Sequence, residues 1–72
     1  MIAIVLNGEP KEIAEGKSIM DLVNSLNLPT ERLAVEHNFK IVKRANWNSQ
    51  ALEDGDKVEI VQFVGGGSVG NR

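Results

Sequence analysis

Residues 54–67, with the sequence DGDKVEIVQFVGGG, decide the fold. The segment opens on a strong turn signal at residues 54–56. It continues as an expected strand over residues 57–64, in which Val61 and Phe63 share one face. Because the strand is apolar on both faces toward its end, it is either covered on both sides or presents an apolar patch to a partner.

The beginning of the chain predicts a β-hairpin. Residues 2–6 are rich in β-branched side chains and stop at Asn7-Gly8. Asn-Gly tolerates the positive φ angles of a tight turn, so a second strand is expected over residues 10–14. Pro10 cannot donate a backbone hydrogen bond, which places it at a strand start or on a sheet edge.

One amphipathic helix is expected after the hairpin. Ser18 is a typical N-cap, and Asp21 places a negative charge in the electropositive first turn. The helix ends near Asn27, with Pro29 as the stop. Its apolar stripe, at spacing i, i+3, i+4 and i+7, consists of Ile19, Leu22, Val23 and Leu26.

The middle of the chain predicts two further strands. Residues 33–37 form one strand, residues 38–40 a turn and residues 41–42 a short returning strand, followed by a helical piece near residues 44–47. A hairpin followed by a helix that crosses one sheet face gives an α+β architecture. With the final strand added parallel beside the first, the fold is a β-grasp (ubiquitin-like) fold, with a mixed four- to five-stranded sheet packed on one main helix.

The domain is expected to span residues 1–64, followed by a flexible glycine-rich tail over residues 65–72. The 72-residue chain has no cysteine, which excludes disulfides, thiolate catalysis and cysteine-ligated zinc. Its net charge of −2 comes from interspersed charges and argues against nucleic acid or a membrane surface as the main partner. No apolar run approaches the roughly 18 residues of a membrane span. Residues 1–6 lack the basic leader of a signal peptide, so we expect a cytoplasmic protein. We also expect the protein to be a monomer when free.

Few residues suggest chemistry of their own. His37 is interpreted as a surface residue at a strand end, and Trp47 as a cap over the core. No nucleophile is paired with a base, so no catalytic residue, no metal site and no enzyme is predicted. A solvated acidic edge is expected at Glu53, Asp54, Asp56 and Glu59. Two interpretations stay open for Val5, Val61, Phe63 and Val64: a patch that binds a partner, or ordinary surface or partial core.

The chain resembles the ThiS family of sulfur carriers of thiamine thiazole biosynthesis over essentially residues 1–67. The Asp-Gly-Asp turn that leads through an apolar strand into glycines is the most specific part of the resemblance. The remaining matching residues are 4–9, 21–23, 33–38, Arg44 and Trp47.

The resemblance implies a carrier, not an enzyme. A ThiF-type adenylating enzyme would use ATP and magnesium to activate the carboxylate of Gly67, which would then receive sulfur from a persulfide donor. Thiazole synthase (ThiG) would take the sulfur from the resulting thiocarboxylate. Gly65 and Gly66 would thread into the partner's active site, and the carrier itself would hold no stable cofactor.

Five residues follow the expected terminal glycine: Ser68, Val69, Gly70, Asn71 and Arg72. Only a chain end has an α-carboxylate, so Gly67 must become the last residue before it can be adenylated. Three explanations stay open: removal by a protease, an artificial addition, or a natural variant with another role.

Three alternative functions share this fold. A ubiquitin-like protein modifier and a carrier like the small subunit of molybdopterin synthase both use a C-terminal glycine. A non-covalent binding module of the TGS type needs no such glycine.

Overall fold

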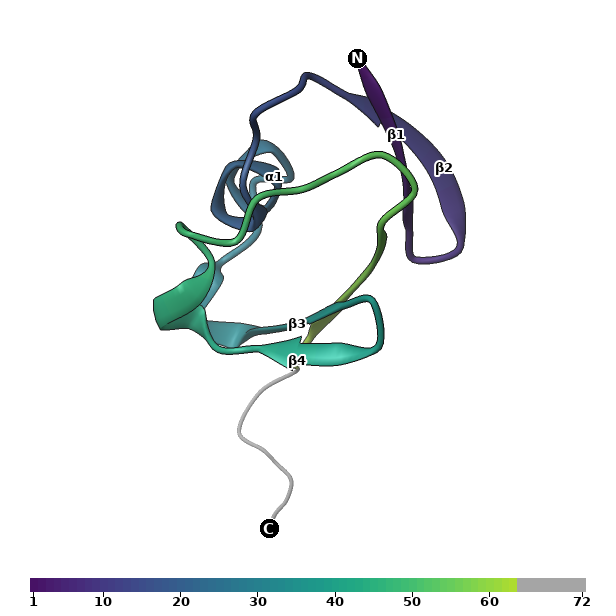
Figure 1. The fold of residues 1–72 in the computed structure, drawn as a ribbon. Coiled ribbons are helices and arrows are strands. Elements are labelled where there is room, and N and C mark those ends of the chain that lie inside the picture. Colours follow the sequence, from purple (N-terminus) through teal and green to yellow (C-terminus); the bar gives the residue numbers. More distant parts are fainter. Residues whose placement is uncertain (64–72) are drawn as a thin grey trace, which may run out of the picture.

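The computed structural model describes residues 1–63, which form one five-stranded mixed sheet curled around a single α-helix (Figure 1). The strand order is β2-β1-β5-β3-β4. The elements are β1 (Ile2–Leu6), β2 (Glu9–Ile13), α1 (Ile19–Ser25), β3 (Leu33–His37), β4 (Lys40–Val42) and β5 (Lys57–Gln62), with 3-10 turns at Thr30–Arg32 and Arg44–Asn46. The predicted architecture is confirmed. The predicted boundary between a domain over residues 1–64 and a tail over residues 65–72 lies outside the described residues.

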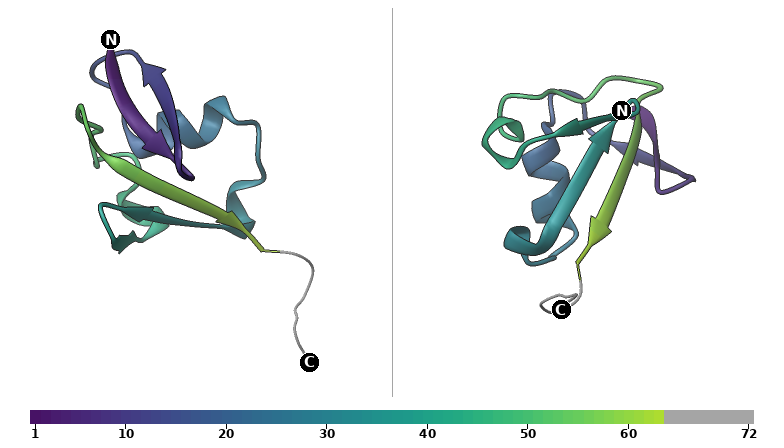
Figure 2. Two further views of the ribbon diagram at one scale, coloured as in Figure 1. Left: turned by 90° about the vertical axis from the view of Figure 1, so that its right-hand side faces the viewer. Right: turned by 90° about the horizontal axis from the view of Figure 1, so that it is seen from below.

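The central strand is β5, which comes last in the described chain. It runs parallel to β1, with Val5 opposite Lys57, and antiparallel to β3, with Val35 opposite Ile60. The two hairpins β1–β2 and β3–β4 therefore lie on either side of β5, as both views of Figure 2 show. The parallel placement of the last strand beside the first follows the prediction, and it makes β5 the central strand of the sheet.

The core lies between the sheet and α1. Ile19, Leu22 and Val23 of α1 are buried, as the helical spacing predicts. Trp47 is 1% exposed, and its indole Nε1 donates to the backbone oxygen of Val42 at 2.8 Å. The interpretation of Trp47 as a cap over the core is confirmed, because the ring buries its apolar body while its one polar atom keeps a partner.

A capping box fixes the start of α1. The Ser18 hydroxyl accepts from the Asp21 backbone N–H, and the Asp21 carboxylate accepts from the Ser18 backbone N–H. That second hydrogen bond lowers the pKa of Asp21. The helix ends at Ser25, slightly before the expected end near Asn27, because Asn27 itself adopts a positive φ of 58°.

Both hairpins turn through two residues with positive φ. Asn7 and Gly8 have φ values of 50° and 84°, and Asn38 and Phe39 have values of 51° and 73°. This pattern is that of a type I′ turn, in which glycine suits the second position. Phe39 occupies that position with its ring 80% exposed and with the Lys57 ammonium 5.3 Å from the ring centroid. The β3–β4 turn therefore contains backbone strain that a glycine would relieve.

We expect Phe39→Gly to raise the free energy of unfolding by about 1 kcal/mol, since a Cβ disfavours this backbone conformation and glycine does not. Phe39→Ala is the matched control, because it also removes the ring but keeps the Cβ. Urea unfolding of the two variants measures the difference. A glycine variant no more stable than the alanine variant would contradict the assignment of strain to this turn.

Candidate functional site

The outer face of the sheet, defined here as the face that points away from α1, carries the residues at which a partner was predicted. Val58 and Ile60 of β5 point inward and are buried, whereas Val61 and Phe63 are 55% and 56% exposed. Alternation along the strand therefore puts Val61 and Phe63 on the outer face.

Val5 lies on the same face but away from the other two. It is opposite Lys57, four positions before Val61 on β5. At 3.3 Å for each residue of a parallel strand, that spacing is about 13 Å. Val5 therefore belongs to the other end of the face, and Val64 lies outside the described residues. The binding role of all four residues stays a prediction.

The structure adds one residue that sequence reasoning missed. Ile41 of β4 is opposite Glu36 of β3, and Glu36 is in turn opposite Glu59 of β5, so all three side chains lie on the outer face. Ile41 is 74% exposed. The alternation of Ile41 with the half-buried Val42 was a signal that Ile41 is exposed. Only the strand register shows which residues lie beside Ile41.

The end of β5 is held from both sides. The Asn7 side chain continues the pairing where β1 stops, because its Oδ1 accepts from the Ile60 N–H at 2.8 Å and its Nδ2 donates to the Ile60 oxygen at 3.2 Å. On the other side, the Phe63 N–H donates to the Arg32 oxygen at 2.7 Å. The chain is thus fixed up to Phe63. Gly65, Gly66 and Gly67, for which tail threading and sulfur attachment are predicted, lie outside the described residues.

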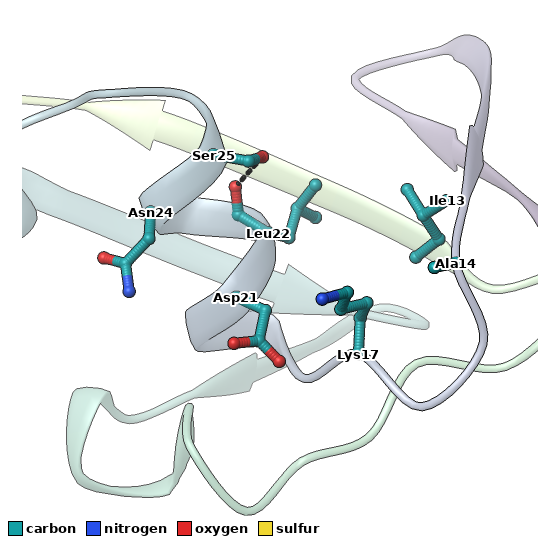
Figure 3. A pocket seen from close by; sticks show the side chains of 7 residues that line it. All are labelled: Ile13, Ala14, Lys17, Asp21, Leu22, Asn24 and Ser25. Carbon is teal, nitrogen blue, oxygen red and sulfur yellow. Dashed lines mark hydrogen bonds between the residues drawn. The ribbon is translucent and has the colours of Figure 1, made fainter.

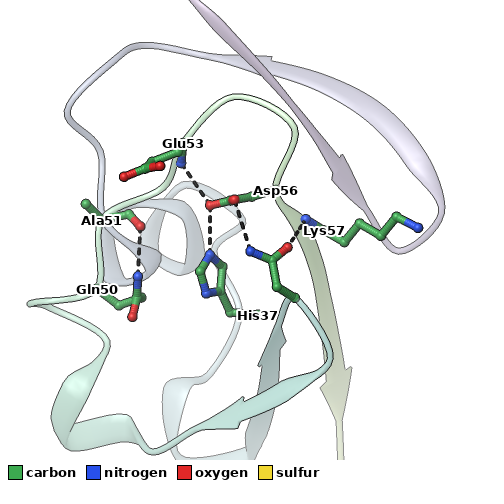
Figure 4. Close-up of polar contacts among 7 residues, drawn as sticks. His37, Gln50, Ala51, Glu53, Asp56 and Lys57 are labelled. Atoms are coloured by element: carbon green, nitrogen blue, oxygen red, sulfur yellow. Dashed lines mark hydrogen bonds and ion pairs between the residues drawn. The ribbon is translucent and has the colours of Figure 1, made fainter.

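A buried carboxylate fixes the start of β5 (Figure 4). Asp56 Oδ2 lies 2.7 Å from His37 Nε2 and accepts from the Glu53 N–H at 2.9 Å, while its Oδ1 accepts from Asn38 Nδ2 at 3.1 Å. Burial by itself would raise the pKa of Asp56, but these hydrogen bonds outweigh it and hold the pKa below the usual value of an aspartate.

Two interpretations from the sequence are therefore wrong in part. His37 ends β3 as predicted, but its side chain is only 15% exposed. Asp56 is not part of a solvated edge, since its side chain is 12% exposed, whereas Glu53, Asp54 and Glu59 are exposed as predicted. Their contact joins residues 19 positions apart, which no local pattern shows. Within residues 1–63, no three potential ligands gather in a way that could hold a metal ion.

A groove of about 370 Å³ lies between the end of β2 and α1 (Figure 3). Ile13 and Leu22 supply apolar lining, and Lys17 and Asp21 supply opposite charges. The Ser25 hydroxyl in its wall already donates to the Leu22 oxygen at 2.7 Å. The groove lies on the helix side of the sheet and is separate from the end of β5.

Among the described residues, no helix has the length and apolar character needed to cross a membrane.

Comparisons with known proteins connect this geometry to one family. The family model described as "ThiS family" matches residues 4–67. A thiazole synthase of Paramagnetospirillum magneticum is 38% identical over 65 residues, which is 90% of this chain but only 20% of that protein. The sulfur carrier protein ThiS of Bacillus subtilis is 40% identical over 50 residues, covering 69% of this chain and 76% of the relative.

A solved structure has the same fold. The crystal structure of the thiamine biosynthesis protein ThiS from Geobacter metallireducens superposes with a TM-score of 0.80 at 30% identity, covering 92% of this chain and 100% of the other. The likeness therefore extends over nearly the full length of both chains.

Proposed function

The chain belongs to the ThiS family, and we propose that it is a sulfur carrier for thiamine biosynthesis, with the sulfur held as a thiocarboxylate at Gly67. The observation that carries this proposal is the family match, which covers residues 4–67 and stops at Gly67. The name of the Bacillus subtilis relative, a sulfur carrier protein, supports the same role.

The chemistry that we propose begins with activation of the Gly67 carboxylate. A carboxylate is a poor electrophile, so a ThiF-type enzyme with ATP and magnesium would convert it to an acyl-adenylate and release pyrophosphate. A persulfide sulfur would then attack the acyl carbon, and AMP would leave. Reductive cleavage of the resulting acyl disulfide by a thiol would leave a thiocarboxylate on Gly67.

The carrier's own contribution would be binding and positioning, which is where proximity supplies rate. The end of β5 suits this role, because the hydrogen bonds between Asn7 and Ile60 and the one from the Phe63 N–H to the Arg32 oxygen fix the strand just before the glycines. A rigid head of this kind would present Gly67 at a limited distance from a docked partner. The proposed role is therefore that of a carrier and not of an enzyme.

We propose a thiazole synthase of the ThiG type as the enzyme that accepts the sulfur. The thiazole synthases of Paramagnetospirillum magneticum and Magnetococcus marinus each match this chain over only 20% of their length. A region similar to this chain thus occurs within proteins that bear the name of the synthase, which supports a working association of the two.

Mass spectrometry of the intact protein from its native host tests the proposal. Residues 68–72 must be absent from the active form, since Gly67 needs a free carboxylate. We expect a mass that matches the chain ended at Gly67, together with a form in which one oxygen is replaced by sulfur. A single mass for the chain through Arg72, without sulfur, would contradict the proposed function.

A further inference from the structure

Two glutamates are directly paired across neighbouring strands on the outer face of the sheet. Glu36 of β3 is directly opposite Glu59 of β5 in the register, and both residues are exposed. The Cβ atoms of such a pair lie about 5 Å apart, and like charges at this spacing repel each other. The central strand pair therefore carries an electrostatic repulsion at the middle of its outer face.

No cation in the described part of the chain neutralises this acidic pair. Among residues 1–63, the ion pair between His37 and Asp56 stands alone. Lys57, the cation on the same face two residues before Glu59, has its ammonium over the ring of Phe39. Within residues 1–63, Lys57 therefore forms no ion pair with either glutamate.

Apolar side chains lie beside the acidic pair and continue from it along the outer face. Ile41 is opposite Glu36 on its other side and is 74% exposed. Val61 and Phe63 continue the outer face toward the end of β5 and are 55% and 56% exposed. Apolar groups with a few charges at fixed places are typical of surfaces that bind another protein.

We propose that the adenylating enzyme docks on this surface and inserts one basic side chain, an arginine or a lysine, between Glu36 and Glu59. The inserted cation would relieve the repulsion, and an arginine would do so with paired hydrogen bonds. Ile41, Val61 and Phe63 would supply the apolar contacts around it. This inference rests on the proposed function, because it takes its partner from there.

The position of the surface favours this partner over a second copy of the chain. Gly67 follows Phe63 by four residues, a span of at most about 14 Å, so an enzyme that acts on Gly67 must lie close to the end of β5. Two copies that meet through this face would bring four carboxylates together. Self-association is therefore opposed by the same charges that attract a basic partner.

The test uses the double variant Glu36→Gln/Glu59→Gln. Its matched control is Glu9→Gln/Glu15→Gln, which removes the same charge at two exposed residues outside this surface. Both variants and the unsubstituted chain are produced in the native host, so that each carries the C-terminus that the cell gives it. Calorimetry measures their binding to the host's ThiF-type enzyme at low and at high salt.

We expect the Glu36/Glu59 variant to bind about tenfold more weakly at low salt and to lose most of its salt dependence, with the control within about twofold of the unsubstituted chain. The Tm of the Glu36/Glu59 variant should rise because the repulsion is gone, so weaker binding would not come from unfolding. If the two glutamates have no part in binding, the Glu36/Glu59 variant should show the rise in Tm without any loss of affinity for the enzyme.

Three results would overturn the proposal. Equal affinity of the unsubstituted chain and the Glu36/Glu59 variant would overturn it alone and leave the carrier function standing. Dimer formation by the unsubstituted chain through this face, accompanied by unchanged enzyme binding of the Glu36/Glu59 variant, would identify a second copy as the occupant. Failure of the unsubstituted chain to bind the enzyme at all would overturn the proposal and the proposed function together.

Discussion

The chain ended at Gly67 is expected to be adenylated by a ThiF-type enzyme with ATP and magnesium, whereas the chain continued through Arg72 is expected to give no detectable product. The reason is chemical, because Gly67 within a longer chain has an amide in place of the carboxylate oxygen that attacks ATP. Release of pyrophosphate and the mass of the acyl-adenylate measure the reaction. Equal activity of the two chains would contradict the assignment of Gly67 as the reacting residue.

A second variant tests whether the reaction needs a glycine at position 67 in addition to a free carboxylate. Gly67→Ala in the shortened chain keeps the carboxylate but adds a Cβ at the reacting residue. We expect adenylation to fall about a hundredfold, because small displacements of a reacting group have effects of this size. The Tm is expected to be unchanged. A loss of Tm would show that the effect arises from the fold.

The substitution with the largest expected effect on stability is Asp56→Ala, which should lower the free energy of unfolding by about 3 kcal/mol. The variant leaves three donors without an acceptor, and each such loss costs about 1–3 kcal/mol with only partial recovery from water. The donors belong to His37, Asn38 and Glu53, so the start of β5 also loses its side-chain contact with His37 of β3. Urea unfolding at pH 7 gives the difference.

The neighbouring Asp54→Ala is the control, because Asp54 is exposed and accepts one hydrogen bond, from the Ala3 N–H. It should cost about 1 kcal/mol or less. Equal losses of unfolding free energy in Asp56→Ala and Asp54→Ala would show that the buried network stabilises the fold no more than a single hydrogen bond in a turn.

Stability should also depend on pH through Asp56. Its pKa is lower in the folded protein than the ordinary value of 3.8, so its contribution is fully present above that value and is lost as the pH falls through the folded pKa. We therefore expect unfolding free energies to be level near neutral pH and to fall below about pH 4. Asp56→Asn should show a smaller fall, with the remainder due partly to Asp21, whose pKa is lowered in the same direction. An identical acid dependence in both proteins would contradict this role of Asp56.

The sequence predicted most of the fold because its signals are local. Asn7-Gly8 indicated the first hairpin, and Ser18 indicated the start of the helix. The spacing of the apolar residues predicted which side of α1 faces the core. The boundaries shifted by a few residues at most: the second strand spans Glu9–Ile13 where residues 10–14 were expected. Trp47 was placed correctly because a large ring in a loop needs burial.

The site was predicted only in part. The exposed faces of Val61 and Phe63 followed from alternation, and the resemblance to the ThiS family placed Gly65, Gly66 and Gly67 at the end of the strand. The position of Val5 relative to Val61 was harder to foresee, since it depends on how β1 and β5 are aligned.

The amino-acid sequence by itself determined the elements, their order and the family, because turn chemistry, capping and hydrophobic period are properties of short segments. Only the tertiary structure decided that Glu36 lies opposite Glu59 beside Ile41, and that His37 contacts Asp56. These pairs join segments far apart in the chain, and their alignment is set by the packing of the sheet on α1. A shift of one residue in that register would turn every side chain of a strand to the opposite face.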